Sequence, residues 1–282
     1  MRNIILISAK WVLPVVALFI VSITANAQKL PTVQKVSLRA PTNIKIDGQA
    51  TEWDNKLQAY NNATDIFYTI ANDDENLYLT VRATKPRIIQ KIIAVGIGFT
   101  INNLARKNDK ASENITVTYP FLEFKTGENI ISTVGLKSVN IIPGLTDTTA
   151  ETAFVRKKAD SLIIIANKMF ENQSKIIKIK GLIGITDTLI SVYNEQSIRV
   201  AGLFDNTKAY TLEVAIPLKH LGLSIDNLSK FSYNIKLISR FDANKGIVRT
   251  YYRYGSAGDQ IDMNADLDST TDFWGDYTLV KK

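Results

Sequence analysis

Short runs in which apolar and polar residues alternate recur along most of the chain. In the run Leu77 to Ala83, leucine and valine alternate with tyrosine and threonine, so the two sets of side chains lie on opposite faces of a strand. Turns rich in asparagine, aspartate, glycine and proline separate such runs, which is typical of an all-β, mainly antiparallel sandwich or barrel. The pattern predicts strands at Ile44–Ile46, Ile66–Ala71, Leu77–Ala83, Ile92–Ile101, Asn114–Tyr119, Phe121–Phe124, Ile130–Val134, Val139–Ile142, Ile176–Ile185, Thr188–Tyr193, Ile198–Ala201, Tyr210–Ile216, Phe231–Phe241, Val248–Tyr254 and Tyr277–Val280.

One stretch departs from this rhythm and predicts a helical insertion packed on the sheet. Between Thr148 and Phe170 apolar residues recur at helical spacing, and Thr148 with Glu151 forms a capping box ahead of them. The subset Leu162 to Ile165, taken alone, equally fits a buried strand. The pattern therefore leaves both helix and strand open for residues 148–170.

The first residues have the pattern of a cleaved export signal. Residues 1–27 combine the basic Arg2 and Lys10 with the apolar run Trp11 to Ile23, and they end in Ala25-Asn26-Ala27, the small-x-small pattern that signal peptidase recognises. The apolar run is shorter than the roughly 20 residues that a membrane-spanning helix needs. We therefore expect an exported protein, periplasmic or extracellular, without an integral membrane segment after cleavage.

Composition narrows the function further. The 282 residues suffice for a sizeable core, and the absence of cysteine excludes disulfides, thiolate metal sites and cysteine nucleophiles. Without Arg2 and Lys10, 32 of the 34 basic residues remain against 27 acidic ones, a net charge of +5. The basic residues are dispersed and not interleaved with aromatic residues, so we expect no nucleic-acid partner. The expected organisation is a linker over 28–43 and a single β-sandwich domain over 44–282.

Four segments occur in an order that resembles one group of sandwiches: IDGQATEW at 46–53, NDDENLYLTVRAT at 72–84, YTLEVAIPLKHLGL at 210–223 and DFWGDYTL at 272–279. They resemble the DOMON-like sandwiches related to family 9 carbohydrate-binding modules. The chain also resembles exported Bacteroidetes proteins of similar length. No landmark lies between Ile130 and Ser197. The resemblance implies a DOMON-like or family-9-like fold, and its landmarks are turns and core positions more than functional ones.

Individual landmark residues have structural explanations. Asp47 and Gly48 suit a turn in which the aspartate bonds its own backbone and the glycine has a positive φ. Glu213 alternates with Leu212 and Val214, so it faces away from their layer. We interpret these residues as parts of the frame.

Aromatic residues are the candidates for ligand binding, because a flat ring packs on the apolar face of a pyranose. Trp53 and Trp274 are the tryptophans outside the signal segment, and ligand-stacking tryptophans are part of what the resemblance implies. Tyr252 and Tyr254 share one face of a predicted strand and Arg253 lies on the other, so alternation exposes one set or the other. The resulting prediction is an exported, non-catalytic protein that binds a glycan or small saccharide.

An acidic loop offers a possible metal site. Oxygen-bearing side chains at alternate positions are the ligands that Ca²⁺ prefers, and they occur here at Asp262, Asn264, Asp266 and Asp268. The loop departs from the EF-hand pattern, with Leu267 at the glycine position and no glutamate at the twelfth. The resemblance to modules that hold structural calcium favours the ion, so Ca²⁺ is an optional cofactor and none is required.

Other functions compete with glycan binding. The sandwich is also compatible with a cell-envelope structural or protein-interaction module, whose partner the sequence does not name. A carboxylate-based glycoside hydrolase would draw on acids such as those of the turn Asp73 to Glu75. His220, the only histidine, lies in a predicted helical turn over Leu218–Leu223 and leaves little basis for a catalytic triad. Haem binding, as in some DOMON relatives, would need Met169, Met263 or His220 in one cavity.

Overall fold

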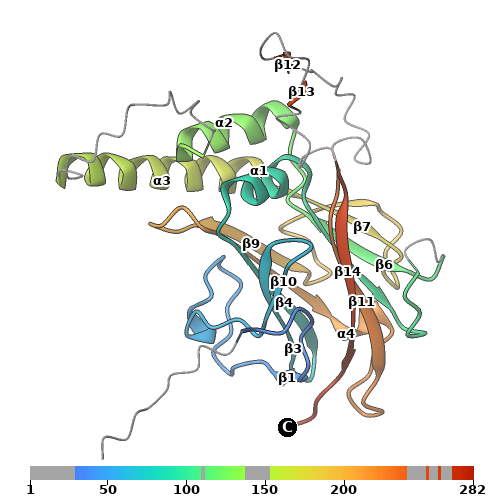
Figure 1. Cartoon of the computed structure of the whole chain (residues 1–282). Helices are drawn as coiled ribbons and strands as arrows, with labels where there is room; N and C mark the ends of the chain where they lie inside the picture. The colour runs from blue at the N-terminus through green and yellow to red at the C-terminus, as the bar shows by residue number, and fades with distance from the viewer. Residues whose placement is uncertain (1–28, 109–111, 137–152, 240–251, 254–259, 262–268) are drawn as a thin grey trace, which may run out of the picture.

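The computed structural model describes residues 29–108, 112–136, 153–239, 252–253, 260–261 and 269–282, and its main feature is a pair of six-stranded sheets (Figure 1). The first sheet has the order β1-β3-β4-β10-β9, with β2 also paired to β3. All its pairs are antiparallel except β1 with β3. Its strands are β1 (Leu38–Arg39), β2 (Ala59–Asn61), β3 (Ile66–Asn72), β4 (Asn76–Ala83), β9 (Arg199–Phe204) and β10 (Tyr210–Pro217).

The second sheet is antiparallel throughout and has the order β14-β11-β5-β6-β7-β8. Its strands are β5 (Ile97–Asn102), β6 (Ile115–Tyr119), β7 (Ile176–Lys180), β8 (Leu189–Ser191), β11 (Lys230–Leu237) and β14 (Thr271–Thr278). A separate two-stranded pair joins β12 (Tyr252–Arg253) to β13 (Gln260–Ile261).

The inner faces of the two sheets share one apolar core. Alternate residues of the central strands point into it, as the period-two pattern predicts for strands buried on one face. Tyr68 of the first sheet and Tyr233 of the second are fully buried, and their hydroxyl oxygens lie 2.9 Å apart in a hydrogen bond that crosses the core. Phe273 packs on Tyr68 with ring centroids 5.0 Å apart. Aromatic packing therefore joins the layers where disulfides are absent.

The helices α1 (Pro86–Val95), α2 (Phe124–Val134) and α3 (Ala153–Gln173) cover one end of the sheets. The short α4 (Leu218–Leu221) follows β10 away from that end, and the 3₁₀ turn η1 (Thr51–Trp53) packs through Trp53 on the outer face of the first sheet. Figure 1 shows α2 and α3 side by side with α1 next to them, and α3 also packs on β9. On α3 the buried residues Ile163, Ala166 and Phe170 recur at helical spacing, which confirms the helix predicted within 148–170.

Several predicted strands are wrong. Ile92–Ile101 combines the end of α1 with β5, because Gly96, at φ 84°, ends the helix within one continuous apolar run. Ile130–Val134 is the last part of α2, Phe121–Phe124 forms no strand, and Ile44–Ile46 is irregular. The last strand begins at Thr271, well before Tyr277. The fold is therefore mostly β with several helices rather than all-β, and Val139–Ile142 lies outside the described residues.

The segment assigned to a linker contains β1, which pairs with β3. Gln34 is buried, and its side-chain amide both accepts the Ile70 N–H and donates to the Ile70 carbonyl, each at 2.8 Å. A side-chain amide has one donor end and one acceptor end, so it satisfies both backbone groups of one strand residue. In the part of the chain that the structure describes, no helix has the length and apolarity needed to cross a bilayer.

Candidate functional site: a groove beside the open edge of β9

Strand β9 is the last strand of the first sheet, and alternate residues turn their backbone groups away from β10. The Asp205 N–H donates to the Ala209 carbonyl at 2.9 Å, which makes this position of the β9–β10 register a hydrogen-bonded pair. In an antiparallel ladder such pairs alternate with pairs that exchange no hydrogen bonds. Val200, Gly202 and Phe204 therefore point their N–H and C=O groups to the free edge.

Two asparagine side chains close this free edge at its ends. Asn167 of α3 accepts the Phe204 N–H and donates to the Phe204 carbonyl, both at 2.8 Å. Asn194 does the same for Ile198, at 3.1 Å and 2.8 Å respectively. Between the two amides, the backbone groups of Val200 and Gly202 form no hydrogen bond with any described residue. We call these two residues the β9 window.

The β9 window opens into a groove of about 630 Å³. Helix α3 forms one wall, and the segment after β8 forms the other. Its lining includes Ile164, Asn167, Lys168 and Glu171 on α3, Lys175, Val192 and Tyr193 near β8, and Asp47 on the turn above β9. Figure 1 shows α3 lying along β9, which places the groove at the rim where the two sheets meet the helical layer.

Tyr193 presents an aromatic ring at the rim of the groove. Its side chain is 77% exposed, whereas tyrosines of the core such as Tyr68 and Tyr210 are buried. The Lys175 ammonium donates to the Tyr193 hydroxyl at 2.7 Å and lies 5.0 Å from the ring centroid. Because the lysine holds the ring by its hydroxyl end, the ring is oriented while much of its surface remains open to solvent.

The floor of the groove is tightly packed. An added Cβ at Gly202 would overlap the Tyr210 hydroxyl, so only glycine fits where β9 crosses this tyrosine. Tyr119 donates to the Ser174 Oγ at 2.9 Å, and burial raises the pKa of Tyr119 to about 12, so its hydroxyl stays protonated. Among the described residues, the buried Tyr210 hydroxyl has no hydrogen-bond partner.

The two tryptophans predicted to bind ligand lie on opposite outer faces of the molecule. Trp53 is half-buried against the first sheet and donates its indole N–H to the Thr80 hydroxyl at 3.1 Å. Trp274 is half-buried on the outer face of the second sheet, opposite Asn234 of β11, which in turn lies opposite Thr100 of β5. The structure therefore does not bring the two rings into one site, and neither lines the groove.

The remaining predicted site residues fall largely outside the described structure. Tyr252 and Arg253 form β12, and nothing is described of their side chains. No group of three acidic or histidine side chains able to hold a metal occurs within the ranges that the structure describes. The other predicted residues lie outside those ranges: Tyr254 and the metal candidates Asp262, Asn264, Asp266 and Asp268.

The landmark residues instead form a buried polar network. Glu213 is fully buried, and its Oε2 accepts the N–H groups of Asp47 and Gly48, each at 3.0 Å. The Thr80 hydroxyl lies 3.4 Å from Glu213 Oε1 and also accepts the Trp53 indole N–H. Burial raises the pKa of Glu213 to about 7. The network anchors the 47–53 segment to the sheet and sets Asp47 beside the groove.

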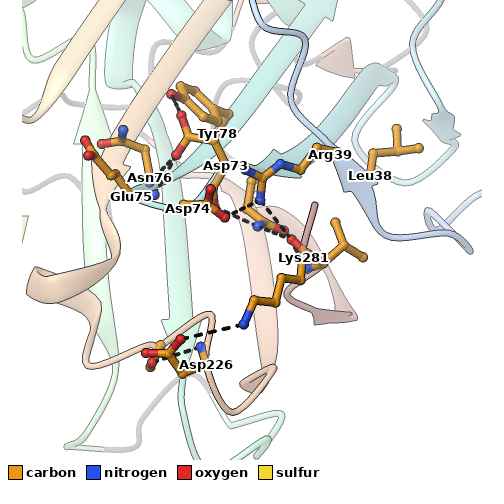
Figure 2. Close-up of polar contacts among 12 residues, drawn as sticks. Leu38, Arg39, Asp73, Asp74, Glu75, Asn76, Tyr78, Asp226 and Lys281 are labelled. Carbon is orange, nitrogen blue, oxygen red and sulfur yellow. Dashed lines mark hydrogen bonds and ion pairs between the residues drawn. The ribbon is translucent and has the colours of Figure 1, made fainter.

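The acidic turn between β3 and β4 is occupied by local bonding. Figure 2 shows Asp73 accepting hydrogen bonds from two backbone N–H groups of the turn, one of them that of Glu75, and from the Tyr78 hydroxyl. Burial and this bond raise the pKa of Tyr78 to about 12. Asp74 forms an ion pair with Arg39 at 2.7 Å. The carboxylate of Asp73 therefore stabilises the β3–β4 turn, and that of Asp74 links the turn to Arg39 of β1.

His220 joins two loops. Its Nδ1 lies 2.9 Å from the Ile183 carbonyl oxygen and its Nε2 lies 3.2 Å from that of Gln196. With both ring nitrogens against backbone carbonyls, His220 is not placed to ligate iron. Met169 packs against the core, and Met263 lies outside the described residues.

Comparison of the chain with protein-family models, with curated proteins and with solved structures finds no match. The function is therefore proposed from the geometry and chemistry of the groove. Sequence reasoning missed Tyr193, Asn167 and Gly202 of the groove, and also Asn194 at the end of the β9 window. A glycine inside an otherwise regular strand was the available local signal, since such a residue often marks a close approach.

Proposed function

We propose that this protein is an exported, non-catalytic binding protein whose groove holds a glycan. The observation that carries the proposal is the exposed, lysine-anchored ring of Tyr193 beside the β9 window. A pyranose ring has an apolar face for the tyrosine and hydroxyl groups for the backbone. The DOMON-like and family-9-like resemblance of the sequence favours the same ligand class.

The backbone groups of the β9 window suit sugar hydroxyls. Asn167 and Asn194 each satisfy one residue of this edge with a neighbouring donor and acceptor. Two adjacent hydroxyls of a pyranose offer the same combination, because one donates to a carbonyl while the other accepts an N–H. The window is thus a fixed set of polar groups that needs no side-chain reorganisation to meet a sugar.

Isothermal titration of the mature chain, residues 28–282, against a panel of oligosaccharides tests the proposal. We expect at least one glycan to bind, and Tyr193→Ala to weaken its affinity about tenfold or more, which is about 1.4 kcal/mol. Trp274→Ala is the matched control, since it removes a half-buried aromatic ring from the other candidate surface. If Trp274→Ala abolishes binding while Tyr193→Ala does not, the site is on the outer face of the second sheet instead.

A hydrolase is the competing function at the same place. Asp47 and Glu171 both line the groove, and glycoside hydrolysis requires two carboxyl groups that flank the scissile bond. Incubation of each bound glycan with the protein, followed by chromatography of the sugars, separates the two. Recovery of intact glycan supports binding alone, and shortened products that disappear in Glu171→Gln establish catalysis.

Export is tested separately at the N-terminus. Expression of the full chain in a bacterial host, followed by N-terminal sequencing of the secreted or periplasmic product, should give a chain that begins at Gln28. Protein that keeps residues 1–27 and fractionates with the membrane would contradict the proposed cleavage.

A further inference from the structure

The groove has three kinds of chemistry within one small volume. The β9 window supplies backbone N–H donors at Val200 and Gly202. The α3 wall supplies the exposed carboxylate of Glu171 as an acceptor. Apolar side chains also line the groove, namely those of Ile164 on α3, which is 68% exposed, and Val192 after β8. A ligand that accepts from the window, donates to Glu171 and carries a small apolar group would use all three.

We infer that the groove selects glycans that contain N-acetylated amino sugars, an inference that rests on the proposed glycan-binding function. The carbonyl and the N–H of an acetamido group point in opposite directions, and its methyl group is apolar. Its carbonyl accepts from the β9 window, its N–H donates toward Glu171, and its methyl contacts Val192, whose backbone N–H is bonded to Lys175 just after α3. The attached pyranose ring then lies within reach of Tyr193.

The edge geometry favours such a compact group over an extended peptide. A peptide that adds to a sheet edge needs a run of free backbone groups along the strand. Here the Asn194 and Asn167 amides already occupy Ile198 and Phe204, so only Val200 and Gly202 remain open. Closing an edge in this way is how proteins prevent strand addition. The window is short, and a single substituent of a sugar matches its length.

Three tetrasaccharides with the same β-1,4-linked glucopyranose backbone test the inference directly. They carry an acetamido group, a hydroxyl or an ammonium at C2 of each ring, as in chitotetraose, cellotetraose and fully deacetylated chitotetraose. We expect titration of the mature chain to give at least tenfold tighter binding for the acetylated form than for either of the others.

Variants separate the contribution of the Tyr193 ring to affinity from that of the Glu171 carboxylate to selectivity. Tyr193→Ala is expected to weaken binding of every tetrasaccharide that binds. Glu171→Ala is expected to reduce the preference for the acetylated form to less than threefold, whereas Glu171→Gln, which keeps a side-chain carbonyl acceptor, should retain most of it. Circular dichroism spectra of the variants that match the wild type show that the fold is intact.

The outcomes are distinguishable. Equal affinity for the acetylated and hydroxyl forms overturns the inference and leaves the glycan proposal standing. Tightest binding of the ammonium form also overturns it, because Glu171 then acts as a simple counter-ion. Absence of binding by all three and by the wider glycan panel overturns both proposals, and so does displacement of a bound sugar by an extended peptide that binds more tightly.

Discussion

Replacing Glu213 by glutamine removes a carboxyl group that folding buries completely. Glutamine keeps a carbonyl oxygen for the N–H groups of Asp47 and Gly48 and places an amide nitrogen toward Thr80. The substitution therefore preserves the shape of the network and the acceptor for both N–H groups, and it reverses the direction of the hydrogen bond with the Thr80 hydroxyl while it removes the ionisable proton. The pH dependence of stability isolates the effect of burying a charge, because the changed hydrogen bond at Thr80 does not vary with pH.

The size of the effect follows from the pKa. Burial raises the pKa of Glu213 to about 7 from the 4.5 of an exposed glutamate. Between these values the folded state keeps a proton that the unfolded state releases. The contribution of Glu213 to stability is therefore fully present below pH 4.5 and is lost as the pH rises through about 7. At about 1.36 kcal/mol per pH unit, the loss has an upper limit of about 3 kcal/mol.

Urea unfolding of the mature chain, followed by circular dichroism from pH 5 to pH 8.5, measures this contribution. We expect the stability of Glu213→Gln relative to the wild type to increase with pH and to level off above about pH 8. Glu52→Gln, which removes a partly exposed carboxyl from the same neighbourhood, serves as the control and should keep most of the wild-type slope, because burial, more than the charge of Glu52, raises the pKa of Glu213. Parallel pH curves for Glu213→Gln and the wild type would refute the reasoning.

Three further substitutions test the packing around the groove, each by urea unfolding of the mature chain. Tyr210→Phe removes a buried hydroxyl that lacks a partner among the described residues, so stability should stay the same or rise by about 1 to 3 kcal/mol; a fall of similar size would mean that the hydroxyl is bonded. Gly202→Ala places a methyl group against Tyr210 and should cost about 1 to 3 kcal/mol, whereas an unchanged midpoint would mean that β9 shifts freely. Asn194→Ala leaves both backbone groups of Ile198 unpaired and should cost about 1 to 3 kcal/mol; a neutral result would mean that water replaces the amide at no cost.

Local sequence patterns predict local structure well in this chain. The hairpin β3–β4, the strand β10 with the turn of α4 after it, and helix α3 all follow from period-two or helical spacing and from Pro217 and Gly222. The pattern failed for α1 and α2 because most of their apolar residues are isoleucine and valine, which also favour strands. A continuous apolar run such as Ile92–Ile101 has no period that would separate a helix from the strand that follows it.

The groove could not be predicted, because chain segments distant in sequence form it. Asn167 bonds Phe204, which lies 37 positions later in the chain, and no local sequence pattern around either residue predicts the contact. Tryptophan is a common sugar-stacking residue, so the sequence predicted ligand binding at Trp53 and Trp274. In the structure Trp53 bonds Thr80 of the frame, and the exposed ring at the groove belongs to Tyr193.

The central claim is that a glycan binds at the β9 window, and amide chemical shifts report on the two N–H groups concerned. In a ¹⁵N–¹H correlation spectrum of the mature chain titrated with the tightest-binding oligosaccharide, we predict that Val200 and Gly202 show some of the largest shifts. The amides of Asn234 and Trp274 on the second sheet should stay unchanged. Shifts concentrated at Asn234 and Trp274, or no shift of Val200 and Gly202 at saturation, would contradict the claim.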